Sequence, residues 1–203
     1  MVSRPHGPPE SASRSDAPTR LWTCDEYRRL AELGILDPEE RVELLEGEIV
    51  MLAAQRPPHS TSVRLVEEAL RKAFGAGWDV RSLLPLTLGK RSEPEADVAV
   101  VRGSIRDYAQ AHPTTAALVV EVSDTTLRLD RSRKWSIYAK GAIPEYWIVN
   151  LVDRVVEVHR DPGPLKGAQY GAGYTTRHIA GEDGTVSPLA APESAIAVKD
   201  LLP

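Results

Sequence analysis

The sequence predicts one mixed α/β domain in which helices flank a β-sheet. Short apolar runs with the composition of strands recur along the chain, for example at 97–101 and 117–122. Between Val63 and Phe74, apolar residues recur at spacings of three and four, which is typical of a helix with one face on the core. A chain of 203 residues is long enough for one domain with a substantial core.

The N-terminal region is expected to be a disordered tail over residues 1–20, followed by a single domain over 21–203. The first 18 residues are rich in Pro, Ser and Arg and offer almost nothing to bury. Regular structure is expected from Thr23, because Thr23-Cys-Asp-Glu26 matches a capping box. That helix should continue through Leu33, and Gly34 should end it.

A β-hairpin is predicted next, from apolar runs at 42–45 and 49–52 that flank Glu46-Gly47. A short helix leading into a strand is the alternative. The segment Pro57-Pro58-His59-Ser60 ends the hairpin and opens the helix that contains Val63 and Phe74. Gly75 and Gly77 should close this helix.

The rest of the chain is predicted to be mostly strands, with one further helix. Asp130 is a plausible N-cap for a helix over 131–140, which Gly141 should stop. The form of the connection that contains Pro113 stays open. The expected strands cover residues 78–84, 86–88, 97–101, 117–122, 145–150, 155–159, 174–179 and 195–198.

Composition excludes several classes of protein. Hydrophobic residues make up 42% of the chain and charged residues 27%, which fits a soluble globular protein. No apolar stretch approaches the roughly 20 residues that span a bilayer, and the N-terminus lacks the apolar segment of a secretory signal. The single cysteine, Cys24, excludes an internal disulfide and a cysteine-based zinc site. We therefore expect a cytoplasmic protein with no membrane partner.

The charge balance argues against a protein that coats nucleic acid through bulk electrostatics. The chain has 29 acidic and 25 basic residues, a net charge of −4. Local charge differs: residues 128–140 carry five basic side chains and one acidic side chain, a local charge of +4. Such a run is most often a solvated helix face. The net negative charge does not exclude a nuclease, because the charge that matters for binding a substrate is local.

Glu121 is the first candidate functional residue, because it interrupts an apolar run that predicts a buried strand. The alternation of side chains places Val119 and Glu121 on one face of that strand. A buried carboxylate is costly unless a cation lies against it. Glu121 is therefore either a metal ligand, a member of a buried ion pair, or a glutamate on a solvated edge.

Asp97 is the second candidate, at the start of a predicted strand after a Pro-containing turn. An unpaired aspartate is cheap there, so a structural role is the alternative. Asp97 and Glu121 are 24 residues apart, which suits two strands joined by one excursion, with both carboxylates at the same end of a sheet. Glu95 would point to the same side as Asp97 and is a further ligand candidate.

Lys134, Glu43 and His59 complete the candidates. Lys134 and Tyr138 share a helix face at a spacing of four, although a surface pair between Asp130 and Lys134 would be the commoner arrangement. His59, next to a helix N-terminus, either binds phosphate with free backbone amides or is a surface loop residue. Glu43 is a further acidic candidate.

These residues occur in an order that resembles the Uma-two type putative restriction endonuclease family, within the PD-(D/E)XK nuclease superfamily. The resemblance covers roughly residues 21–160 and, more loosely, the rest of the chain. The motifs that carry it, in order, are Thr-Cys-Asp-Glu-Tyr, Arg41-Val-Glu43-Leu-Leu-Glu-Gly47-Glu48, Pro-Pro-His59-Ser, Glu93-Pro-Glu-Ala-Asp97-Val-Ala-Val-Val, Leu-Val-Val-Glu121-Val-Ser, Asp130-Arg-Ser-Arg-Lys134-Trp-Ser-Ile-Tyr138 and Gly141-Ala-Ile-Pro-Glu145-Tyr-Trp147-Ile-Val.

The resemblance implies a restriction-endonuclease-like core, a mixed sheet flanked by helices, with Mg²⁺ or Mn²⁺ at Asp97 and Glu121. Lys134 matches the family's helix lysine, Glu43 its first acidic position and His59 its pre-helix histidine. Two departures stand out. Ala96 replaces the usual proline before the aspartate, and Ser123 stands where the superfamily's Glu-x-Lys has its lysine, so Lys134 is expected to supply the missing cation.

The expected function is metal-dependent endonucleolytic hydrolysis of phosphodiester bonds, with DNA as the substrate. Lys134 would orient the attacking water or stabilise developing charge, and Arg131 and Arg133 would contact backbone phosphates. Alanine at Asp97, Glu121 or Lys134 is expected to abolish cleavage while leaving folding nearly intact. The alternatives are a non-catalytic nucleic-acid-binding or regulatory protein that retains the fold, and hydrolysis of another phosphate substrate. A homodimer stays open.

Overall fold

A six-stranded mixed sheet, in the order β3-β4-β5-β6-β7-β8, forms the centre of the protein. The computed structural model describes residues 18–37, 39–52 and 54–203. β5 and β6 pair in parallel and the other neighbours are antiparallel, which confirms the predicted mixed α/β fold. The strands are β3 (Trp78–Pro85), β4 (Glu95–Arg102), β5 (Leu118–Ser123), β6 (Glu145–Asn150), β7 (Val155–Pro164) and β8 (Ala172–Gly181).

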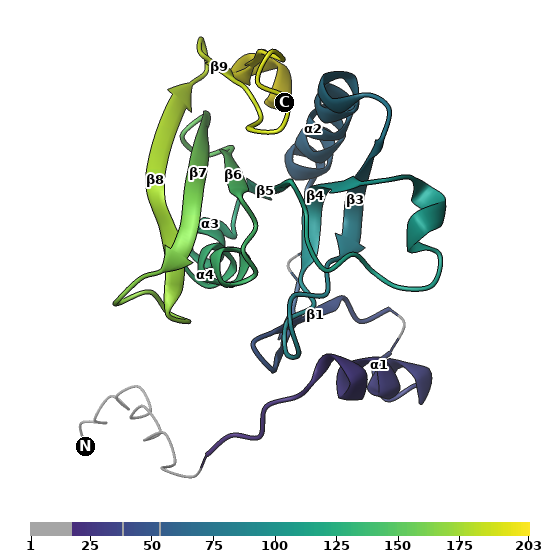
Figure 1. Ribbon diagram of the computed structural model, residues 1–203. Coiled ribbons are helices and arrows are strands. Elements are labelled where there is room, and N and C mark those ends of the chain that lie inside the picture. The colour runs from purple at the N-terminus through teal and green to yellow at the C-terminus, as the bar shows by residue number, and fades with distance from the viewer. Residues whose placement is uncertain (1–17, 38, 53) are drawn as a thin grey trace, which may run out of the picture.

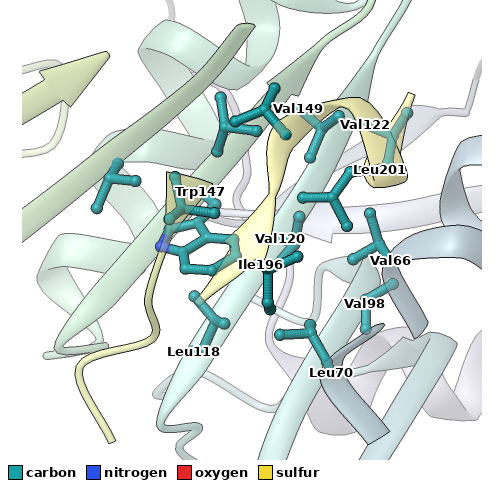
Figure 2. Packing of buried hydrophobic residues seen from close by; sticks show 14 of the residues in the cluster. Val66, Leu70, Val98, Leu118, Val120, Val122, Trp147, Val149, Ile196 and Leu201 are labelled. Atoms are coloured by element: carbon teal, nitrogen blue, oxygen red, sulfur yellow. The ribbon is translucent and has the colours of Figure 1, made fainter. Parts of the chain in front are cut away.

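Helix α2 (Pro57–Phe74) covers one face of this sheet and lies beside β3 and β4 (Figure 1). The predicted apolar face of α2 is buried against the sheet. In Figure 2, Val66 and Leu70 of α2 lie beside Val98 of β4, and Leu201 of the C-terminal segment joins the same cluster. This segment contains β9 (Thr185–Val186), β10 (Ile196–Ala197) and η3 (Val198–Leu201), so only part of the strand expected at 195–198 forms.

Alternation along β5 sends neighbouring side chains to opposite faces. Val120 and Val122 belong to the cluster beneath α2, whereas Val119 belongs to the cluster on the other face, with Ile137 of α4 (Trp135–Lys140). Glu121 has the same parity as Val119 and therefore points toward the helix between β5 and β6.

The N-terminal elements form as expected. α1 (Cys24–Glu32) begins at Thr23 with both hydrogen bonds of a capping box, and Gly34 follows with a φ of +67°. β1 (Val42–Leu45) and β2 (Glu48–Met51) form an antiparallel hairpin, so the hairpin prediction is confirmed over the helical alternative. Apart from exposed residues 18–20, the tail predicted at 1–20 lies outside the described residues.

The connection from β5 to β6 is a helix that begins earlier than predicted. It comprises α3 (Leu127–Leu129), a π-helical turn η2 (Asp130–Lys134) and α4, and it ends at Gly141. Asp130 is therefore not the N-cap. Its buried carboxylate accepts hydrogen bonds from the Ser123 hydroxyl at 2.7 Å and the Thr126 hydroxyl at 2.6 Å.

Two other predictions about the strands were wrong in detail. Residues 86–88 are not a strand. Leu86 and Leu88 are buried in a loop, where their amides donate to the carbonyls of Pro94 and Ser92, and burial alone explains the apolar run. β4 begins at Glu95, so Asp97 lies within a strand rather than at its start.

The connection that contains Pro113 includes a short 3₁₀ turn, η1 (Ile105–Tyr108). No helix in the described part of the chain is long and apolar enough to cross a membrane.

Candidate functional site

All six residues singled out in the sequence as ligand or catalytic candidates line one pocket of about 130 Å³. They come from five different elements: Glu43 from β1, His59 from α2, Glu95 and Asp97 from β4, Glu121 from β5 and Lys134 from η2. His59 is the third residue of α2 rather than a residue before it. The two prolines ahead of it carry no N–H, and the Ser60 amide donates to the Arg56 carbonyl, so few amides remain there for a phosphate.

The site lies where β4 and β5 separate. Their ladder pairs Val98 with Val120 and ends there, and one further step of that register would set Asp97 opposite Glu121. Two carboxylates directly opposite each other destabilise a ladder. Instead, Asp97 Oδ2 accepts a hydrogen bond from the Val122 amide at 2.8 Å and lies 3.2 Å from His59 Nε2.

Lys134 reaches Glu121 from the helix. Its Nζ lies 3.1 Å from Glu121 Oε1 and 3.2 Å from Glu43 Oε2, and the residue is only 4% exposed. The ordinary surface pair with Asp130 is thus not the arrangement found. Tyr138, one turn further along, donates its hydroxyl to the same Glu121 Oε1 at 2.5 Å. Lys134 and Tyr138 together fix the orientation of Glu121.

Burial and charge act differently on the two members of this pair. It raises the pKa of Glu121 well above its ordinary value, against the opposing effect of the Lys134 charge. Burial lowers the pKa of Lys134, but the carboxylates of Glu121 and Glu43 outweigh it and hold that pKa well above the usual range. Lys134 is therefore a charged ammonium group at neutral pH, held by acidic neighbours.

Glu43, Asp97 and Glu121 each have one carboxylate oxygen engaged and one that accepts no hydrogen bond from the described residues. The engaged atoms are Asp97 Oδ2, Glu121 Oε1 and Glu43 Oε2, which also accepts from the Glu95 amide at 3.1 Å. Glu43 Oε1 is buried without any partner in the described part of the chain. Buried acceptors without donors are costly, so this pocket is chemically suited to a cation.

The arginines expected to contact phosphates are engaged elsewhere. Arg131 binds Glu157, with Nε at 3.0 Å from Oε1, and Arg133 lies 3.0 Å from Glu48 and donates to the Tyr170 hydroxyl at 2.8 Å. Neither arginine lines the pocket.

Sequence reasoning overlooked three charged residues that also line the pocket, Arg41, Arg56 and Asp124. Asp130 lines it as well, although the sequence suggested only a helix cap or a surface pair for this residue.

A family model described as "Putative restriction endonuclease" and named Uma2 matches residues 24–198, which is most of the chain. The chain belongs to the Uma2 family. This confirms the resemblance indicated by the motifs, including its looser part after residue 160, through β8 to β10.

A solved structure shares the fold of this Uma2 chain. It is the crystal structure of a protein from Anabaena variabilis described as "a putative nuclease belonging to DUF820". The two chains are 18% identical, with a TM-score of 0.65 over 88% of this chain and 96% of the other. Identity at this level supports the fold only. No curated protein matches the sequence.

Proposed function

We propose that this protein is a divalent-metal-dependent endonuclease that hydrolyses phosphodiester bonds of DNA. One observation carries the proposal: Asp97 and Glu121 lie where β4 and β5 separate, with Lys134 bound to Glu121 in the same pocket. The family description and the nuclease-like neighbour support the reaction class.

The residues in the pocket fit Mg²⁺ or Mn²⁺. Carboxylate oxygens are the ligands these ions prefer, and Asp97 and Glu121 each keep one oxygen without a hydrogen bond from the described residues. No group of three or more His, Cys, Asp or Glu side chains in the described ranges has the arrangement of a metal site. Magnesium commonly uses only one or two carboxylates, with waters and substrate phosphates completing its shell.

A bound divalent ion supplies neutralisation of phosphate charge and a lower pKa for water. The protein's own groups do the rest. The Val122 amide and His59 hold one oxygen of Asp97, so the other is presented in a fixed direction. Lys134 places a positive charge at the pocket, where it stabilises negative charge that develops on a reacting phosphate.

The test is a cleavage assay on supercoiled plasmid and on single-stranded DNA, with Mg²⁺, Mn²⁺ or a chelator. Asp97→Asn and Glu121→Gln keep the shape of each side chain, and each should lower the metal-dependent rate by about 100-fold or more. Glu182→Gln, at an exposed position paired with Arg154, is the control and should cleave normally.

Calorimetric titration with Mn²⁺ separates the rival functions. A folded protein that neither cleaves nor binds the ion would sink the nuclease proposal in favour of a non-catalytic binding module. Normal cleavage by both site variants would show that the reaction occurs elsewhere. If the protein binds the metal but hydrolyses only small phosphate esters, the substrate is a small phosphate ester rather than DNA.

A further inference from the structure

The pocket carries more negative charge than an approaching phosphodiester would tolerate unaided. Six carboxylates line it: Glu43, Glu95, Asp97, Glu121, Asp124 and Asp130. Like charges repel strongly where water is scarce. Lys134 is buried and already engaged with two of these carboxylates. Beside the proposed divalent ion, further cations at the mouth of the pocket would favour binding of a substrate with one charge per phosphate.

Two exposed arginines lie at that mouth. Of the described lining residues, only Arg41 and Arg56 combine a permanent positive charge with substantial exposure, at 41% and 64% of their side chains. Arg41 directly precedes β1, and Arg56 is the N-cap of α2. They stand at the two ends of the hairpin segment whose Glu43 also lines the pocket.

Each arginine forms an ion pair with a residue on or next to one of the strands β4 and β5. Arg41 lies 2.6 Å from Glu95, two residues before Asp97 on β4. Arg56 lies 3.4 Å from Asp124, three residues after Glu121 and directly past the end of β5. One guanidinium therefore lies beside the strand that carries Asp97, and the other lies at the end of the strand that carries Glu121.

We propose that Arg41 and Arg56 form a phosphate clamp, which binds backbone phosphates on the two sides of the pocket and so positions a nucleic-acid strand across it. A guanidinium has five N–H donors, and each of these ion pairs uses a single nitrogen contact. The remaining donors suit phosphate oxygens, which arginine binds in a bidentate manner.

The acidic partners have a defined part in this clamp. Exposed ion pairs contribute little to stability, so exchanging or sharing Glu95 and Asp124 with a phosphate costs little. In the absence of substrate, the same pairs hold two long side chains at the pocket instead of leaving them disordered in solvent. The clamp depends on the proposed function for its substrate class, but its binding role is measurable without cleavage.

The experiment measures binding of fluorescently labelled DNA, duplex and single-stranded, by anisotropy in the presence of a chelator over a range of salt concentrations. The variants are Arg41→Gln, Arg56→Gln and the double variant. Arg154→Gln is the matched control, because Arg154 is similarly exposed and paired with Glu182 but lies outside the pocket. Circular dichroism checks that every variant is folded.

Each single variant should weaken binding several-fold at low salt and reduce the slope of log K against log salt by about one, and the double variant by about two. Lysine at both positions should restore most of the slope. An unchanged slope in the double variant would overturn the clamp, as would equal weakening by Arg154→Gln or a wild-type protein that binds no DNA.

Binding and cleavage test the two proposals separately. Arginine-dependent binding without metal-dependent cleavage would uphold the clamp and refute the endonuclease. Cleavage at the wild-type rate and salt dependence in the double variant would refute the clamp alone.

Discussion

Lys134 is the residue on which the site's charges depend most. It is buried between Glu121 and Glu43, and Tyr138 supports the same arrangement. Removing one partner from a buried ion pair leaves an uncompensated charge, which costs more than the pair itself contributes. From this burial we now expect that alanine at Lys134 destabilises the fold, unlike the expectation drawn from the sequence that folding would stay nearly intact.

Lys134→Met should lower the free energy of unfolding by about 3 kcal/mol or more, because two buried carboxylates lose their cation. Urea unfolding followed by circular dichroism measures this. The triple variant with Glu43→Gln and Glu121→Gln should regain a large part of the loss, since the two carboxylates that contact Lys134 are then neutral amides. Equal stability of wild type and Lys134→Met would mean that the lysine is not held by these carboxylates.

Periodicity predicted most of the elements, and tertiary context decided the rest. The apolar residues from Val63 to Phe74 were enough to predict α2, because they recur at spacings of three and four, the period of a helix with one face on the core. The π turn at 130–134 has no such signal: Asp130 fits an N-cap, and only the hydroxyls of Ser123 and Thr126 show that it is enclosed. Strand pairing likewise depends on a neighbour, which is why the two-residue β9 was missed.

The packing of β8 on α4 can be tested with two glycines that face each other across strands β7 and β8. A Cβ at Gly173 would lie 2.1 Å from the Trp135 ring, whereas a Cβ at Gly163, its cross-strand partner, would meet no atom of the described residues within 4 Å. Gly173→Ala should therefore lower stability by about 1–3 kcal/mol through overpacking. Gly163→Ala should be neutral or slightly stabilising. Thermal unfolding of both variants decides; equal melting temperatures would contradict this packing.

At the scale of the whole molecule, the site is an assembly of distant segments. Five elements converge at the pocket: the β1–β2 hairpin, α2, β4, β5 and the helix between β5 and β6. Their convergence brings together Glu43, His59, Asp97, Glu121 and Lys134. Local sequence patterns indicated each residue as a candidate, and the family resemblance assigned the five residues to one site. Their distances, the engaged oxygens and the two arginines at the mouth depend on long-range packing, which no local pattern encodes.

Glu157, a buried carboxylate that does not line the pocket, links three elements of the fold and gives stability a pH dependence. Glu157 is fully buried on β7. It binds Arg131 of η2, and Arg177 of β8 donates from Nη2 to Glu157 Oε2 at 2.7 Å. Burial raises the pKa of Glu157, but the neighbouring His159, Arg131 and Arg177 outweigh burial and hold the pKa far below its usual range.

Because this pKa is depressed in the folded state, the contribution of Glu157 is present above the unfolded pKa of about 4.3 and is lost as pH falls through the folded value. Glu157→Gln should be less stable than wild type at pH 7, and the gap should narrow as the pH falls below about 4. Urea unfolding between pH 3 and 7 measures the gap, with Glu182→Gln as an exposed control. A gap independent of pH would refute the ionised state of Glu157.

Ser123 stands where the Glu-x-Lys motif expected from the sequence resemblance would have its lysine, and its hydroxyl donates to Asp130 in the turn that ends with Lys134. The position without the lysine therefore anchors the helix that supplies one from another direction. A search that requires an acidic residue, any residue and a lysine in succession would pass over this chain, although Lys134 lies 3.1 Å from Glu121. Chains in which a helix places the lysine beside a strand carboxylate are best found by comparing side-chain positions in space rather than adjacent letters in a sequence.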